Sequence, residues 1–139
     1  MGVNDLAEYV AYHQSKLRQQ SQPQPAHSPK NYGVNSIHSR QSYETSILNS
    51  KGIVVLDCFA TWCGPCKFIS PYIEELSESA KYKDAVRFYK LDVDRVEDVA
   101  AELGIRAMPT FLFFKDGKRV EEVVGANRPG IDKVLSQLL

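Results

Sequence analysis

The sequence predicts an α/β domain in which a central mixed sheet is flanked by helices on both faces. Strand-like and helix-like patterns alternate from residue 33 onward, and such alternation gives parallel strands joined by right-handed crossovers. Ile53–Phe59 is an apolar run broken by one charge, which is typical of a strand buried on both faces. Asp116-Gly117 separates two further apolar runs and predicts an antiparallel hairpin at the edge of the sheet.

The expected elements follow one another in the order β-α-β-α-β-α-β-β-α. Ser39 is a suitable N-cap for the first helix, because its hydroxyl can accept a hydrogen bond from a free backbone N–H. Asp94 and Glu97 have the spacing of a capping box, and Gly104 can end that helix. Asn127, followed closely by a proline, can open the last one. Strands are expected at 34–37, 53–59, 86–93, 110–115 and 119–124, and helices at 39–50, 63–82, 94–104 and 127–139.

The second helix carries an apolar stripe and one proline. Ile69, Ile73, Leu76 and Ala80 recur every three or four residues and therefore share one side of the helix. Pro71 has no backbone N–H to donate and should kink the helix where it lies. We therefore expect a long, kinked and amphipathic helix directly after the central strand.

The chain divides near residue 32 into an extension and a domain. Residues 19–31 are rich in glutamine and proline and almost free of apolar side chains, as expected of a linker. Before them, Leu6, Val10, His13 and Leu17 recur at three- or four-residue spacing, which predicts a short amphipathic helix. Residues 1–32 are interpreted as an N-terminal extension, either a disordered tail or a docking helix, and residues 33–139 as one domain.

The composition narrows the class of protein and the compartment. The 139 residues include 17 basic and 17 acidic side chains, so neither nucleic acid nor an anionic membrane is expected as a partner. No signal peptide and no membrane span are visible, and three cysteines are too few and odd in number for a secreted disulfide framework. We expect the reducing cytoplasm. The mitochondrial matrix is the alternative, although Asp5 and Glu8 are unusual in a mitochondrial presequence.

The reactive site is expected at residues 62–67, Trp-Cys-Gly-Pro-Cys-Lys, where the buried strand ends and a helix begins. Free N–H groups at a helix start favour negative charge, so the pKa of Cys63 should fall below the ordinary value of about 8.5 and its sulfur should become nucleophilic. A spacing of three brings Cys66 within disulfide reach of Cys63. We expect Cys63 to be the exposed, attacking sulfur and Cys66, one turn deeper, to be the resolving one.

Metal binding is the main alternative for such a cysteine pair. Structural zinc takes four Cys or His ligands and an iron–sulfur cluster takes four thiolates, but only Cys58 remains, and no histidine lies near the pair in the sequence. Cys58 follows Asp57 on a strand and should point to the opposite face, buried as a small hydrophobe rather than serving a second redox function. Redox chemistry is therefore favoured, with no metal and no bound cofactor.

The motif and several residues outside it resemble the thioredoxin family, and residues 60–62 resemble the lead-in of its eukaryotic members. The resemblance covers about residues 33–139. It implies a thioredoxin fold, with parallel strands and an antiparallel edge hairpin in a central mixed sheet. The matching positions are Asp57, residues 62–67, Pro71, Lys90 and Met108-Pro109-Thr110.

The resemblance implies catalytic roles for four residues. Cys63 attacks the target disulfide and forms a mixed disulfide, which Cys66 resolves to leave the Cys63–Cys66 bond oxidised. Asp57 matches a buried aspartate beneath the motif, and Lys90 matches the lysine that pairs with it. Desolvation should raise the pKa of Asp57, so that it can take a proton from Cys66, directly or through water. The alternative for Asp57 is a satisfied buried carboxylate with no kinetic role.

The resemblance also implies a surface that holds the substrate. Pro109 matches a cis-proline that packs against the disulfide. The segment Ala107–Met108 before it would offer backbone groups to an extended substrate strand, although Met108 and Trp62 could instead be plain packing residues. The expected substrate-binding residues are Trp62, Gly64, Pro65, Ala107, Met108, Pro109, Gly125 and Ala126.

Together these observations predict a protein-disulfide reductase. It is expected to be a monomer that acts on disulfide-containing proteins and is recharged with electrons from NADPH by a thioredoxin reductase. Two rivals remain: a disulfide-forming oxidant, which would require an oxidising compartment, and a non-catalytic binding subunit that uses the domain as a scaffold. Only an enzyme needs both sulfurs, so replacement of Cys66 separates it from a scaffold.

Overall fold

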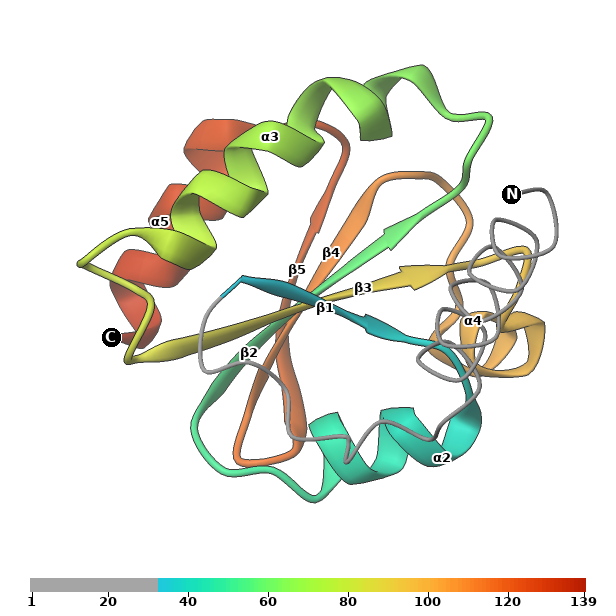
Figure 1. The fold of residues 1–139 in the computed structure, drawn as a ribbon, viewed down its shortest axis with the longest axis horizontal. Coiled ribbons are helices and arrows are strands. Elements are labelled where there is room, and N and C mark those ends of the chain that lie inside the picture. The colour runs from blue at the N-terminus through green and yellow to red at the C-terminus, as the bar shows by residue number, and fades with distance from the viewer. Residues whose placement is uncertain (1–32) are drawn as a thin grey trace, which may run out of the picture.

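The structure, a computed structural model, describes residues 33–139 (Figure 1). The helix and the linker predicted within residues 1–32 lie outside the described residues. The predicted order of strands and helices is confirmed. The elements are β1 (Val34–Ile37), α2 (Arg40–Tyr43), η2 (Glu44–Leu48), β2 (Ile53–Phe59), α3 (Gly64–Glu78), β3 (Val86–Asp92), α4 (Glu97–Leu103), β4 (Thr110–Lys115), β5 (Lys118–Val124) and α5 (Arg128–Leu138).

The five strands form one mixed sheet in the order β1-β3-β2-β4-β5. β3 pairs in parallel with both β1 and β2, whereas β4 pairs antiparallel with β2 and with β5. The predicted combination of parallel strands and an antiparallel edge hairpin is therefore confirmed. β2 lies at the centre of the sheet, which is why nearly all of its residues are buried and apolar.

Helices cover both faces of the sheet, as predicted (Figure 1). α3 and α5 pack on one face over a core that includes Val55 and Phe111. The short helices α2 and α4 pack on the other face over a core that includes Leu56 and Cys58. Successive residues of β2 therefore serve different cores, because side chains alternate along a strand. None of the helices within 33–139 is long and apolar enough to cross a membrane.

The second helix is shorter than predicted. α3 ends at Glu78 rather than near Tyr82, because Ser79 adopts an extended backbone conformation (φ −68°, ψ 148°). The chain then turns so that the Tyr82 ring, only 4% exposed, packs into the core beneath α3 and α5. Burial of that ring outweighs the helical pattern that continues to Ala80, and Ala80 lies outside the helix.

Two other helix boundaries also differ from the expectation. The first helix is capped by Ser39 as predicted, but it widens into the π-helical turns of η2 and ends at Leu48 instead of near residue 50. α4 starts at Glu97 with Val96 in the N-cap position, so the capping box expected at Asp94 is wrong. The Asp94 carboxylate is engaged elsewhere, as described below. Gly104 ends α4 in the left-handed conformation, as predicted.

The hairpin between β4 and β5 turns over two residues. Asp116 (φ 52°) and Gly117 (φ 83°) both have positive φ, the combination that a tight hairpin of this kind requires. The Asp116 carboxylate accepts a hydrogen bond of 2.8 Å from the backbone N–H of Gly52, just before β2. The turn is thereby fastened to the start of the central strand.

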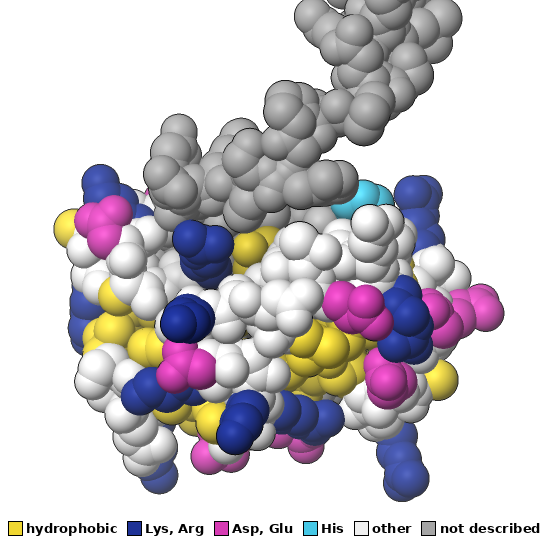
Figure 2. Space-filling view, turned by 90° about the horizontal axis from the view of Figure 1, so that it is seen from below, with side chains coloured by type: hydrophobic (Ala, Val, Ile, Leu, Met, Phe, Trp, Pro, Cys, Tyr) yellow, Lys and Arg dark blue, Asp and Glu magenta, His cyan; other side chains and the backbone are white. Residues whose placement is uncertain are grey.

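Basic and acidic side chains are interspersed on the face of the molecule shown in Figure 2. A network on the α2–α4 side illustrates this mixture, because Arg40 bridges Asp98 at 3.1 Å and Glu102 at 2.9 Å. Charges of mixed sign do not create a broad field of one sign, which agrees with the net charge of zero of the whole chain.

Candidate redox site

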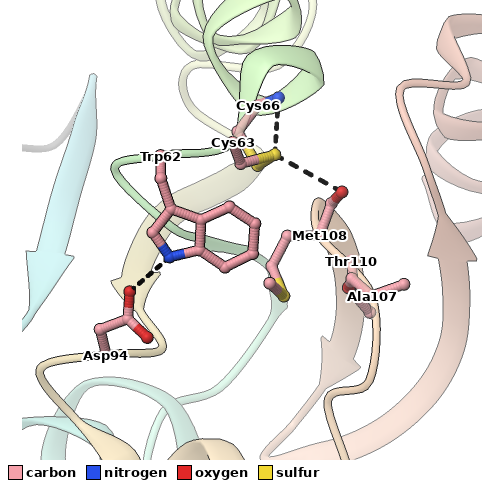
Figure 3. The surroundings of a disulfide bond; sticks show 7 residues. All are labelled: Trp62, Cys63, Cys66, Asp94, Ala107, Met108 and Thr110. Atoms are coloured by element: carbon pink, nitrogen blue, oxygen red, sulfur yellow. Dashed lines mark hydrogen bonds between the residues drawn. A yellow bond between two sulfur atoms is a disulfide. The ribbon is translucent and has the colours of Figure 1, made fainter.

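Cys63 and Cys66 lie at the start of α3 and are joined in a disulfide, with 5.3 Å between their Cα atoms. Cys63 is the N-cap residue of the helix. Its Sγ accepts a hydrogen bond of 3.2 Å from the backbone N–H of Cys66 (Figure 3). The sulfur thus occupies the place that a hydroxyl or carboxylate oxygen usually takes at a helix start. Once the disulfide opens, the same N–H is available to stabilise a Cys63 thiolate.

Both cysteines are almost completely buried in the disulfide form. Each is 5% exposed, so the expected contrast between an exposed Cys63 and a deeper Cys66 is wrong for this state. Val93 and Met108 pack against the pair, and the Met108 carbonyl oxygen lies 3.5 Å from the Cys63 Sγ. These neighbours cover the bonded sulfurs, which a sequence pattern cannot show because they come from distant segments.

Asp57 is the buried carboxylate of the site. It lies near the end of β2, is 6% exposed, and its Oδ1 has no hydrogen-bond partner among the described residues. Burial raises the pKa of the Asp57 carboxyl to about 7, and the positive charge of Lys90 lowers it by a smaller amount. A carboxyl with such a pKa can accept or release a proton at neutral pH.

A cavity of about 230 Å³ connects this carboxyl with the second cysteine. Lys90 lines the same cavity and stands directly beside Asp57 in the register of β2 and β3. It acts through its charge, since no ion pair joins the two side chains within residues 33–139. The volume accommodates several water molecules at roughly 30 Å³ each, so a proton has a path between Cys66 and Asp57. The lining residues are Asp57, Phe59, Ala60, Thr61, Cys66, Lys67, Ser70 and Lys90.

Trp62 lies beside the disulfide with its ring 67% exposed (Figure 3). Its indole Nε1–H donates a hydrogen bond of 2.9 Å to the Asp94 carboxylate, from the loop that follows β3. Sequence reasoning missed this role of Asp94 and used the residue as a helix cap. The signal that could have found it is the indole N–H itself, which usually takes a hydrogen-bond partner.

The loop before β4 carries the expected substrate-binding backbone. The Met108–Pro109 peptide bond is cis, as the resemblance implies. The hydroxyl of Thr110 donates a hydrogen bond of 2.6 Å to the Ala107 carbonyl oxygen and thereby holds the exposed Ala107 in place. Gly125 donates its backbone N–H to the Pro109 carbonyl oxygen at 2.8 Å, so the loop after β5 is fastened to the loop before β4.

The predicted binding residues lie together at one end of the sheet, where β2 ends and β4 begins. In the registers of the antiparallel pairs, Cys58 is opposite Thr110, and Thr110 is opposite Val124. The segments 62–65, 107–109 and 125–126 therefore leave the sheet at the same end. Gly64 and Pro65 are exposed in the first turn of α3, and Ala126 is exposed in the loop that leads to α5.

Cys58 is separated from this chemistry. It is a free thiol with no exposed surface, and it packs on the α2–α4 side of β2. The prediction that it is buried is confirmed. Burial also raises the pKa of its thiol, which makes it a poor nucleophile. Residues 33–139 contain no group of three or more His, Cys, Asp or Glu side chains that could hold a metal ion.

Comparison with known proteins agrees with this site. The thioredoxin family profile matches residues 34–137. The chain is 50% identical over 104 residues to "Thioredoxin Asp f 29" of Aspergillus fumigatus, covering 75% of this chain and 94% of that protein. It is 47% identical over 103 residues to "Thioredoxin-2" of Saccharomyces cerevisiae, covering 74% and 96% of the two chains. The solved structure of Malassezia sympodialis thioredoxin superposes with a TM-score of 0.72 at 41% identity, covering 81% of this chain and 96% of that one.

The similarity therefore extends over nearly the whole length of these relatives and includes the fold as well as the sequence. It coincides with the part of the chain that builds the sheet, the four surrounding helical segments and the cysteine pair. The chain belongs to the thioredoxin family and is a thiol–disulfide reductase that acts on disulfide-containing proteins through Cys63 and Cys66.

Proposed function

We propose that this protein is a general, monomeric protein-disulfide reductase that is recharged by an NADPH-dependent thioredoxin reductase. The observation that carries the proposal is the placement of Cys63. Its sulfur accepts the Cys66 N–H at the start of α3, and Cys66 in turn shares a cavity with Asp57. Cys63 is thus placed to carry a negative charge as a thiolate, and Asp57 is placed to take the proton of the Cys66 thiol.

Reduction proceeds in two exchange steps. The Cys63 thiolate attacks one sulfur of the substrate disulfide, forms a mixed disulfide and releases the other substrate sulfur as a thiolate. Asp57 accepts the proton of the Cys66 thiol through the cavity that both residues line. The Cys66 thiolate then attacks Cys63, and the Cys63–Cys66 disulfide forms as the second substrate sulfur leaves. Two electrons pass to the substrate, and the reductase then supplies two new electrons from NADPH to the oxidised pair.

A solved structure at 34% identity, with a TM-score of 0.69, supports the class of substrate. It concerns the thiol-resolving mechanism of a yeast mitochondrial 1-Cys peroxiredoxin through glutathione and thioredoxin systems. We extend this to the present chain only as a class: a protein that presents a disulfide bond at its surface. Trp62 and the loops at Ala107–Pro109 and Gly125–Ala126 provide the surface that would hold it.

The test is NADPH-coupled reduction of insulin in the presence of a thioredoxin reductase. We expect continuous NADPH consumption that depends on this protein, and none with the Cys63→Ser variant. A Cys66→Ser variant should accumulate mixed disulfides with substrate on Cys63, whereas a non-catalytic scaffold would bind partners as before. A reduction potential typical of an oxidant, rather than of a reductant, would support the disulfide-forming rival instead.

The cytoplasm is the compartment we propose, with the mitochondrial matrix as the alternative. The support is that Cys58 is a free thiol and that the chain has only one closely spaced cysteine pair, which fits a reducing environment. Fluorescence imaging of a C-terminal fusion, with mitochondrial and endoplasmic-reticulum markers, distinguishes these compartments. A signal confined to the secretory pathway would contradict the proposal.

A further inference from the structure

The most exposed aromatic residue within 33–139 is Phe68 on α3, marginally ahead of Trp62. Phe68 is 68% exposed and lies two residues after Cys66. Gly64, Phe68 and Tyr72 are spaced four residues apart, so they form one stripe along the helix that starts at the cysteine motif. The stripe therefore extends the expected substrate surface from Gly64 along α3. A large ring left in water beside a reactive site points to contact with a partner.

A cation from α5 lies over two aromatic rings of this stripe. The Arg128 guanidinium lies over the Phe68 ring, with its Cζ 5.7 Å from the ring centroid, and over the Tyr72 ring at 4.6 Å. Arg128 is the first residue of α5 and follows directly on the loop that contains Gly125 and Ala126. The cation thus lies between two parts of the expected substrate surface, the start of α3 and the loop after β5.

Arg128 is held in position but is not neutralised. Within the described residues no carboxylate lies at ion-pairing distance from it. The nearest candidate on its own helix, Asp132, accepts a hydrogen bond from the Tyr72 hydroxyl instead. Lys67, which precedes Phe68 in the sequence, is exposed and adds a second positive charge to this part of α3. Two aromatic faces restrict the guanidinium before any partner arrives, which reduces the entropy that is lost on binding.

We infer that Phe68 and Arg128 form a specificity subsite that favours protein substrates with an acidic side chain near the target disulfide. The substrate carboxylate would pair with the guanidinium, while the apolar part of the substrate chain covers the Phe68 ring. The inference rests on the proposed function, because it concerns the choice among substrates of that reaction. It adds charge selectivity to a contact surface whose other expected members are neutral.

The experiment compares short peptides that differ in one charge. Each has one cysteine in a mixed disulfide with 2-mercaptoethanol and carries Glu or Lys at one of several positions on either side of the cysteine. Second-order rate constants are measured with pre-reduced protein in a single turnover, so no reductase takes part. At the position that faces Arg128, we expect the Glu peptide to react about two- to fivefold faster than the Lys peptide, as for an exposed ion pair. This ratio should fall toward one in high salt.

The variants isolate Arg128. In Arg128→Gln the Glu-to-Lys ratio should approach one, and in Arg128→Glu it should fall below one. The ratio is taken within each variant, so a general change in reactivity cancels. Lys133→Gln removes the same charge from the exposed side of the same helix and should keep the parental ratio.

Two results would overturn the inference. One is a parent protein that reduces all peptides at equal rates, and the other is a Glu preference that survives in Arg128→Gln or vanishes equally in Lys133→Gln. The neutral disulfide 2,2′-dithiodipyridine serves as the reference substrate for the parent. If the parent fails to reduce even this compound, the proposed function itself fails, and that outcome is distinct from a loss of charge selectivity.

Discussion

The acid–base chemistry of Asp57 depends on its surroundings in the folded protein. In water an aspartate is charged at neutral pH, but burial on β2 raises the pKa of this carboxyl from 3.8 to about 7. Folding therefore favours the protonated form, and the unfolded chain releases its proton first as the pH rises. The contribution of Asp57 to the free energy of unfolding should fall between pH 3.8 and about 7 and stay low above that range.

Replacing this carboxyl should stabilise the oxidised protein at alkaline pH. The difference in free energy of unfolding between Asp57→Asn and the parent should grow from pH 4 to pH 8 by up to about 4 kcal/mol, because three pKa units are involved. Urea unfolding at several pH values measures it. Asp84→Asn, at an exposed carboxylate, is the matched control and should show no such trend. A pH-independent difference would mean that Asp57 is ionised in the folded protein at all these pH values.

The same substitution should slow the second exchange step. Without the carboxylate, resolution of the mixed disulfide by Cys66 at pH 7 should fall by at least about tenfold, since a positioned base is lost. In the parent the rate should rise with pH through about 7, as Asp57 loses its proton, and the variant should lack this rise. Rapid acid quenching of the reaction with a peptide disulfide measures the rate. An unchanged rate would leave Asp57 as a buried carboxylate with no kinetic role.

For single residues, the sequence predicts the chemical role better than it predicts the solvent exposure. The identity of the cysteine pair and the raised pKa of Asp57 follow from local pattern and burial. The near-complete burial of Cys63 does not, because Val93 and Met108 cover it from segments far away in the chain. The tether between Trp62 and Asp94 was missed for the same reason, since the two residues lie 32 positions apart.

Among the elements, the β4–β5 hairpin shows how strictly one turn can limit substitution. Gly117 has a φ of 83°, and a Cβ at this position would collide with the backbone carbonyl oxygen of Leu48. Gly117→Ala therefore combines an unfavourable backbone conformation with a collision against another backbone. The turn cannot relieve that collision by rotating a side chain.

We expect Gly117→Ala to lower the free energy of unfolding by about 2–4 kcal/mol, through backbone strain and displacement of η2. Gly104→Ala is the matched control. Its φ of 71° is similar, but a Cβ there meets no atom within 4 Å, so it should cost only about 1–2 kcal/mol. Chemical denaturation of both variants gives the comparison. Equal losses would show that the contact with Leu48 contributes nothing.

Element boundaries were predictable where a local signal decides them. Ser39, Gly104 and Asn127 end or begin helices because their own side chains or φ values satisfy the helix terminus. The end of α3 was not predictable in this way. Tertiary packing of Tyr82 ends it four residues early, whereas the sequence pattern alone favours continuation.

In the whole molecule, the reactive pair Cys63 and Cys66 is kept apart from the unreactive thiol of Cys58. The reactive pair lies beyond the end of the central strand β2, and the remaining thiol is buried in the core on the α2–α4 side. Neighbouring positions on β2 thus belong to different faces: Asp57 lines the cavity that leads to Cys66, while Cys58 points away from it.

Labelling of Cys58 should therefore report global unfolding. In the oxidised protein it is the only thiol of the chain, and we expect it to react with a maleimide at least about a thousandfold more slowly than in denaturant, because its exposure requires loss of the core. Mass spectrometry over time measures the rate. A destabilised variant such as Gly117→Ala should be labelled faster. Rapid labelling of the native parent would contradict the burial of this thiol.

The chain contains a single tryptophan, and its indole is anchored to Asp94 beside the disulfide. A disulfide quenches the emission of a nearby indole, and here no second indole contributes background. Intrinsic fluorescence should consequently brighten when the pair is reduced and dim when it is reoxidised, so that oxidation and reduction of the pair can be followed optically without a dye. An Asp94→Asn variant, in which the anchor is weakened, should show a smaller difference in brightness between the two states.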